Sequence, residues 1–142
     1  MKTTLKTIVL GLALLVVTSV VKADEPVAAK LTKNHAITTY VNAMTQGKNA
    51  GLKDVIDQTA KFSTLRGKQV VSFDKADMLK FADQNKDIQQ ACTTTTTEVE
   101  TNADMSVVKV DMKYENFTRT NYVTMANTGD GWKITNVYSV FK

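Results

Sequence analysis

The hydrophobic residues in the segment that begins at Asn34 recur at helical spacing. They stand at i, i+3, i+4 and i+7, which places them on one face of a helix: Ile37, Tyr40, Val41 and Met44. Asn34 is expected to cap the N-terminus of this helix. Gly47 is expected to end it, because glycine readily adopts the left-handed conformation found at helix C-termini.

Two shorter helices follow from the same kind of pattern. Leu52, Val55 and Ile56 predict a helix over about residues 50–59. Asp74, with Asp77 three residues later, is an acidic variant of the capping box and predicts the start of a third helix that fades near residue 85. The apolar face of this third helix consists of Met78, Leu79, Phe81 and Ala82.

Between these helices, and after the last of them, the pattern alternates as in β-strands. Residues 60–65 and 68–73 predict a hairpin around Arg66-Gly67. Residues 90–100, with threonine at every position from 93 to 97, predict a strand because threonine is β-branched. Three further strands are expected over residues 105–115, 119–127 and 132–141.

The strand at residues 105–115 has the clearest alternation. Val108, Val110 and Met112 share one face with Tyr114, while the intervening residues are charged. Three helices combined with a run of antiparallel strands predict an α+β domain. We expect a curved, mainly antiparallel sheet that forms a cone around the three helices, since long strands twist and coil.

Residues 1–23 have the pattern of a secretory signal peptide. Lys2 and Lys6 precede an uncharged apolar stretch over residues 7–21, and small residues stand near Ala23. We therefore expect cleavage after residue 23, a linker over residues 24–33 and one domain over residues 34–142, in a periplasmic or secreted protein. An uncleaved membrane anchor is the alternative, although the apolar stretch is short for a membrane span.

Charge and cysteine content narrow the function classes. The chain has a net charge of +4, but without Lys2, Lys6 and Lys22 there remain 15 basic and 14 acidic side chains. This near-neutral balance argues against a nucleic-acid partner. Cys92 is the only cysteine, so no internal disulfide can form. After cleavage of the signal, no apolar stretch is long enough to span a membrane.

Two segments resemble a known superfamily. The sequence from Ile37 to Met44, followed by Gly47 and Leu52, and the ending from Asp130 to Tyr138 are similar to the nuclear-transport-factor-2-like superfamily. Within it, they are most similar to the exported bacterial "putative lumazine-binding" and SnoaL-like branch. The resemblance implies a curved sheet that cups three helices. Members of this superfamily are isomerases, dehydratases and cyclases, small-molecule binders, or dimers that pair through the outer sheet. The resemblance therefore implies one of these roles for this chain.

The residues that carry reactive side chains do not form an evident catalytic set. His35 is expected to be an exposed residue at a helix start, and Cys92 a small buried or edge thiol without a thiolate-stabilising partner. Asp111 shares the parity of Lys109 and Lys113 and is expected to face solvent. A register shift of one residue would instead place Asp111 inside the cone, as an acid–base group. We predict no catalytic residue, no metal site and no cofactor.

Aromatic and methionine residues form the candidate ligand pocket. Two interpretations remain open: a filled core, or a core that stays partly open and lines an apolar pocket. The candidate lining residues are Tyr40, Met44, Phe62, Met78, Phe81, Met112, Tyr114, Met125 and Trp132.

Three functions therefore remain as hypotheses. The first is an exported domain, without catalytic activity, that binds a small apolar or heteroaromatic ligand or self-associates as a homodimer. The second is an isomerase, dehydratase or cyclase with a carboxylate in the cone. The third is a structural domain with a filled core.

Overall fold

The computed structural model describes residues 27–142. The helices are the short 3-10 helix η1 (Ala29–Leu31), α1 (Lys33–Gln46), α2 (Leu52–Val55) and α3 (Lys75–Gln84). The strands are β1 (Ile56–Arg66), β2 (Gln69–Phe73), β3 (Thr93–Thr101), β4 (Met105–Lys113), β5 (Thr118–Thr128) and β6 (Gly131–Phe141). The expected signal peptide at residues 1–23 lies outside the described residues, as does the first part of the expected linker.

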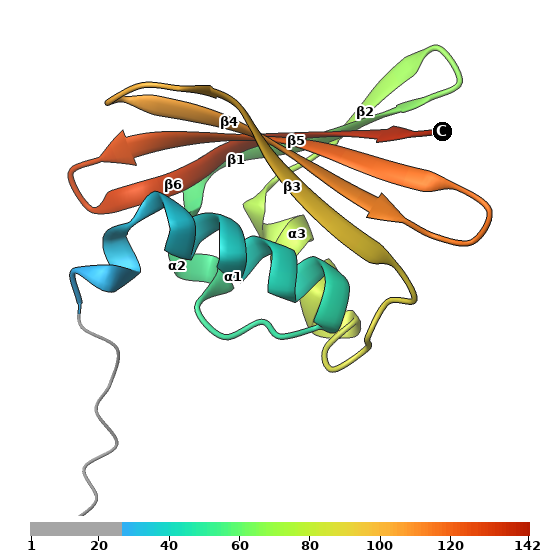
Figure 1. The fold of residues 1–142 in the computed structure, drawn as a ribbon, viewed down its shortest axis with the longest axis horizontal. Helices are drawn as coiled ribbons and strands as arrows, with labels where there is room; N and C mark the ends of the chain where they lie inside the picture. The colour runs from blue at the N-terminus through green and yellow to red at the C-terminus, as the bar shows by residue number, and fades with distance from the viewer. Residues whose placement is uncertain (1–26) are drawn as a thin grey trace, which may run out of the picture.

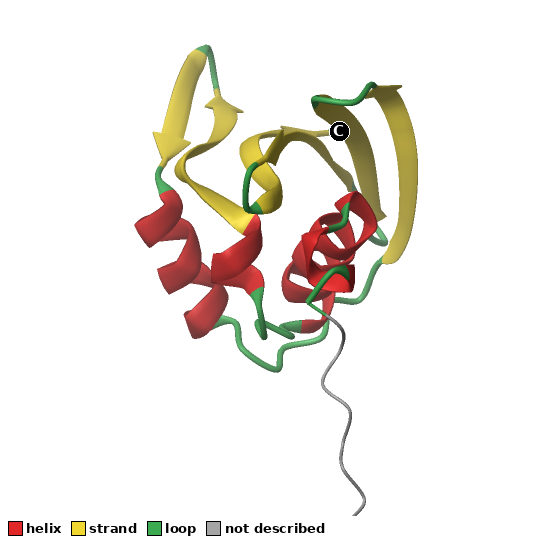
Figure 2. Cartoon of the chain, turned by 90° about the vertical axis from the view of Figure 1, so that its left-hand side faces the viewer, coloured by secondary structure: helices red, strands yellow, loops and turns green. Residues whose placement is uncertain are grey.

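The strands form one six-stranded sheet in the order β2-β1-β6-β5-β4-β3. All neighbours are antiparallel except β1 and β6, which run parallel. The three α-helices lie on one side of the sheet (Figure 1), and the sheet bends over them (Figure 2). The predicted α+β class and the curved, mainly antiparallel sheet are confirmed.

The second helix is much shorter than the predicted range of residues 50–59. It ends at Val55, and β1 begins at Ile56. Ile56 pairs with Ile134 of the parallel neighbour β6, and its side chain is buried. Pairing with β6 therefore converts the second half of the predicted helix into a strand, since tertiary burial outweighs a short local pattern.

The helix ends partly follow the prediction. Thr32, not Asn34, caps α1, because the Thr32 side chain accepts the hydrogen bond from the His35 N–H. Gly47 ends α1 in the left-handed conformation, and Asp74 and Asp77 form the predicted capping box of α3.

The core lies between the helices and the inner face of the sheet. Val108, Val110 and Met112 of β4 are buried there, as the alternation predicts. The threonine-rich β3 is an edge strand and is almost entirely exposed. Across residues 27–142, none of the helices is both long enough and apolar enough to cross a membrane.

Candidate functional site

A cavity of about 490 Å³ opens at one end of the curved sheet, and we call it the mouth cavity. Its walls come from α3, the β1–β2 hairpin and the adjacent ends of β5 and β6, with one residue from α1. Its lining residues are Tyr40, Phe62, Ser63, Thr64, Arg66, Phe73, Asp77, Met78, Lys80, Phe81, Gln84, Arg119, Val137, Ser139 and Phe141.

Three phenylalanines of the mouth cavity are exposed to solvent. Phe73 of β2 is 42% exposed, Phe81 of α3 is 46% exposed and Phe141 of β6 is 55% exposed. Scattered single apolar residues on a surface are common, but three aromatic rings lining one cavity suggest a binding site. Behind them, Phe62 and Val137 are buried and continue the apolar wall into the core.

A polar network that includes Arg119, Tyr40 and Ser139 borders the inner part of the mouth cavity. The Asn121 Oδ1 atom accepts hydrogen bonds from Arg119 Nε at 3.1 Å and from Ser139 Oγ at 2.7 Å. The Asn121 Nδ2 group donates to the Tyr40 hydroxyl at 2.8 Å. Since Arg119 can only donate, this contact determines which end of the Asn121 amide is the oxygen.

Within the network, the Asn121 acceptor is occupied, and the Arg119 guanidinium is the donor that lines the mouth cavity. Asn121 Oδ1 already accepts twice, and the Tyr40 oxygen accepts from Asn121. Burial raises the pKa of the Tyr40 hydroxyl to about 12, against smaller lowering effects of the Arg119 charge and the Asn121 hydrogen bond. Tyr40 is therefore protonated at neutral pH, and its side chain is completely buried.

The charged residues of the mouth cavity are mainly basic. Arg66, Lys80 and Arg119 are cations, and Asp77 is the one carboxylate among the lining residues. Asp77 belongs to the capping box of α3, where its side chain accepts from the Asp74 N–H. Arg119 also lies over the Phe141 ring, with 5.6 Å between its Cζ atom and the ring centroid.

The structure separates the nine candidate pocket residues into several groups. Tyr40, Phe62, Met78 and Phe81 line the mouth cavity. Met44 and Tyr114 line a smaller hollow of about 40 Å³ that shares Phe81 and Arg119 with it. Three residues line neither space: Met112 and Met125, which are buried in the core, and Trp132, which lies at the start of β6 with Lys33 Nζ 5.9 Å from its ring centroid.

Sequence reasoning misses the polar members of the site. Arg119, Asn121 and Ser139 are not among the candidates, although Arg119 and Asn121 share the parity of Val123 and Met125 in β5. Extending that alternation backwards would place both polar side chains on the inner face. Phe73 and Phe141, at the ends of their strands, have no comparable sequence signal.

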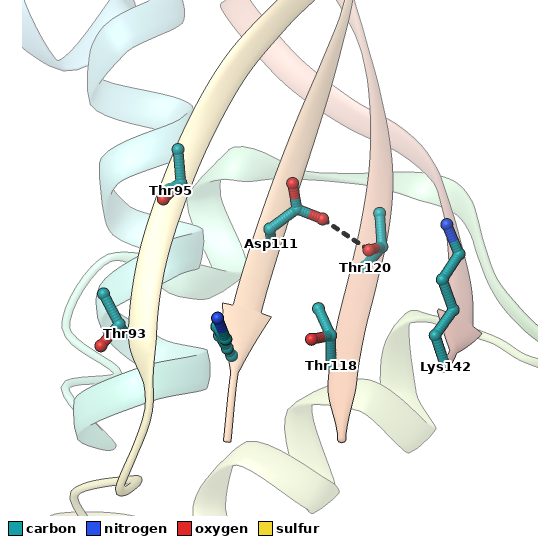
Figure 3. A pocket seen from close by; sticks show the side chains of 7 residues that line it. Thr93, Thr95, Asp111, Thr118, Thr120 and Lys142 are labelled. Carbon is teal, nitrogen blue, oxygen red and sulfur yellow. Dashed lines mark hydrogen bonds between the residues drawn. The ribbon is translucent and has the colours of Figure 1, made fainter. Parts of the chain in front are cut away.

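Asp111 lies on the outer face of the sheet, as its parity predicts. It lines a separate hollow of about 360 Å³ with Lys113, Lys142 and four threonines. Figure 3 shows the Thr120 hydroxyl hydrogen-bonded to the Asp111 carboxylate, at 2.5 Å. This hydrogen bond, with a weaker contribution from Lys109, lowers the pKa of Asp111. Asp111 is therefore ionised at neutral pH and faces away from the mouth cavity.

The other reactive side chains lie apart from the mouth cavity. His35 is half-buried in the first turn of α1, with 3.4 Å between its Nε2 atom and Thr39 Oγ1. Cys92 is a half-buried free thiol just before β3, with 3.8 Å between Sγ and Thr94 Oγ1. Within the part of the chain that the structure describes, no cluster of three or more His, Cys, Asp or Glu side chains could hold a metal ion.

The sequence matches a protein family described as "Putative lumazine-binding" over residues 29–139, which is most of the chain. The protein belongs to this family. The matched range includes α1, α2, α3 and the sheet up to Ser139, and therefore most residues of the mouth cavity. No curated protein matches the chain in sequence.

Solved structures show that this family member has the fold of nuclear-transport-factor-2-like proteins. A nuclear-transport-factor-2-like protein of unknown function from Silicibacter pomeroyi is 15% identical with a TM-score of 0.64, over 77% of this chain and 92% of that one. A similar protein from Pseudomonas aeruginosa is 11% identical with a TM-score of 0.55, over 77% and 94% of the two chains. A protein of unknown function from Pectobacterium atrosepticum is 15% identical with a TM-score of 0.60, over 84% and 93%. At these identities the likeness shows the fold alone.

Proposed function

We propose that this protein is an exported domain that binds a small apolar or heteroaromatic molecule in the mouth cavity and does not transform it. The observation that carries the proposal is the cavity itself. Its volume of about 490 Å³ lies within the range of small-molecule sites. Its wall is aromatic, and a few polar groups converge at its inner end, which is the usual composition of such sites. The family description points to the same class of ligand.

Binding without catalysis is favoured by the position of the carboxylates. An isomerase or dehydratase would need a general base within reach of its substrate. Asp77 is the carboxylate that lines the mouth cavity, and it already serves the capping box of α3. The enzyme alternative therefore depends on Asp77, since Asp111 lies on the other face of the sheet.

Self-association through the outer face of the sheet is a second candidate function. Leu65 and Val70 pair across the β1–β2 hairpin, and they are 51% and 60% exposed. Tyr122 of β5 is also exposed. An outer face with apolar side chains suits a partner of the same kind, such as a second copy of this chain.

The ligand proposal is tested by native mass spectrometry of the protein purified from the periplasm or the culture medium, where the expected signal peptide would direct it. We expect a small molecule to remain bound, and the same spectrum reports the oligomeric state. The Phe73→Ala/Phe81→Ala double variant should lose the bound molecule, because it removes two aromatic walls of the mouth cavity. Tyr122→Ala, which removes an exposed aromatic ring elsewhere, should retain it. A bare chain in every preparation, or equal retention in both variants, would contradict the proposal.

A further inference from the structure

The charge of Arg119 has no protein counter-ion within residues 27–142. The hydrogen-bond partners of its guanidinium are the neutral side chains of Asn121 and Ser139, and its planar group lies over the Phe141 ring. A guanidinium has more N–H groups than these two bonds use. Because Arg119 is half-buried and lines the mouth cavity, the remaining N–H groups are available to a molecule bound there.

The neighbours of Arg119 add to this preference for hydrogen-bond acceptors. Asn121 Oδ1 is occupied by two donors, and Ser139 Oγ uses its own hydrogen in one of those bonds. The Tyr40 hydroxyl accepts from Asn121 and is completely buried, so the half-buried Arg119 is the donor of this network that a ligand can reach. A ligand group rich in acceptor oxygens would satisfy the remaining N–H groups of Arg119. A ligand group that only donates would leave them unpaired, at a cost in binding free energy.

The entrance of the mouth cavity is positively charged, as Arg119 is. Arg66 is the last residue of β1, and Lys80 lies on α3. Both side chains are exposed. Asp77 is the one opposing charge among the lining residues. Two cations at the entrance raise the local concentration of an anion and speed its association.

We propose that the ligand of the mouth cavity is an aromatic anion: a flat ring system held among Phe73, Phe81 and Phe141, with a carboxylate, sulfonate or phosphate group bound by Arg119. This inference rests on the proposed ligand-binding function and specifies its ligand class. Planar oxyanions are the groups that a guanidinium recognises best, because its N–H donors form a rigid fork.

A matched pair of fluorescent probes tests the inference. Anilinonaphthalene sulfonate and N-phenylnaphthylamine share the same ring skeleton, and the sulfonate is present in the first alone. The wild-type protein should bind the sulfonate probe about tenfold or more tightly, as expected for hydrogen bonds to charged groups. Fluorescence titration at fixed ionic strength measures both dissociation constants.

Two variants locate the origin of this preference. Arg119→Gln should remove most of the tenfold preference and change the binding of the neutral probe by less than about twofold. Lys142→Gln also removes one positive charge, but from the hollow around Asp111 on the outer face of the sheet, and it should leave the preference intact. If Arg119→Gln does not fold, the exposed pair Arg66→Gln/Lys80→Gln should still weaken the sulfonate probe severalfold and leave the neutral probe unchanged.

The outcomes separate this inference from the function on which it rests. If both probes bind equally well and both are lost in Phe73→Ala/Phe81→Ala, the anion preference is overturned and the ligand-binding function stands. A sulfonate preference that persists in Arg119→Gln also overturns the inference. If neither probe binds, the result counts against the ligand-binding function as well.

Discussion

Asn121 holds together the polar groups of the mouth cavity. It is completely buried, and its amide contacts Arg119, Ser139 and Tyr40 at once. Buried polar groups are stable only when their partners are present, since the unpaired group keeps its full desolvation cost. Asn121 therefore determines both the stability of the site and the orientation of the Arg119 guanidinium.

Replacing Asn121 tests this role directly. Asn121→Ala should lower the free energy of unfolding by roughly 2–4 kcal/mol, because several buried groups lose their partner. Tyr40→Phe removes one end of the network alone and should cost about 1 kcal/mol. Asn136→Ala, at an exposed position of β6, is the control and should be nearly neutral. Urea denaturation measures all three, and similar values for Asn121→Ala and Asn136→Ala would refute the role of the network.

At the scale of the elements, the end of α1 is joined to the loop that leads into β3. Gly47 has a φ of 65°, and its carbonyl accepts from the Asp87 N–H, while the Thr45 carbonyl accepts from the Gln90 N–H. A Cβ atom at Gly47 would lie 2.5 Å from Asn85 O and Asp87 N. Glycine is required here both for the left-handed backbone and for the close approach of the loop.

Gly67 in the β1–β2 hairpin provides a matched comparison. Its φ is 61°, but no atom lies within 4 Å of the position that a Cβ atom would occupy there. Gly67→Ala should therefore cost about 1 kcal/mol, from backbone strain alone. Gly47→Ala should cost about 3 kcal/mol or more, because the backbone of the loop must also move. Thermal and urea unfolding would measure the difference, and equal costs would show that the close approach is unimportant.

At the scale of the whole molecule, the chain combines an expected export signal with a domain that has no internal disulfide. Cys92 is the only cysteine, so the stability of the domain depends on the packing of three helices against the sheet. A domain of this length can bury enough apolar surface to fold without a covalent cross-link. This arrangement is compatible with the proposed location outside the cytoplasm.

Export is tested by placing a charge in the apolar stretch of the expected signal peptide. Leu14→Arg should block processing and leave the full-length chain in the cell, because a signal peptide needs an uninterrupted apolar region. Leu31→Arg is the control, since Leu31 lies beyond the expected cleavage site and is exposed. Intact mass spectrometry of periplasmic and culture fractions should find the wild type and the control beginning at Asp24. Retention of residues 1–23 by the wild type would contradict export by cleavage.

The local patterns of the sequence were sufficient for most of the elements. Alternation in β4 predicted its inner face, and the spacing of Asp74 and Asp77 predicted the start of α3, because both signals depend on neighbours in the chain. The same local reasoning failed at Ile56. Its pattern continues that of a helix, but its partner, Ile134, is distant in sequence.

The sequence alone determined the fold class, the helices α1 and α3, the β-meander and the outward position of Asp111. Four residues of the mouth cavity were sequence candidates, namely Tyr40, Phe62, Met78 and Phe81, but only the tertiary structure decided which other residues join them. The ends of β1, β5 and β6 meet there through the parallel pairing of β1 with β6, which brings Arg119, Phe73 and Phe141 together. A periodic pattern states which way each side chain points, whereas a cavity depends on which distant strands become neighbours.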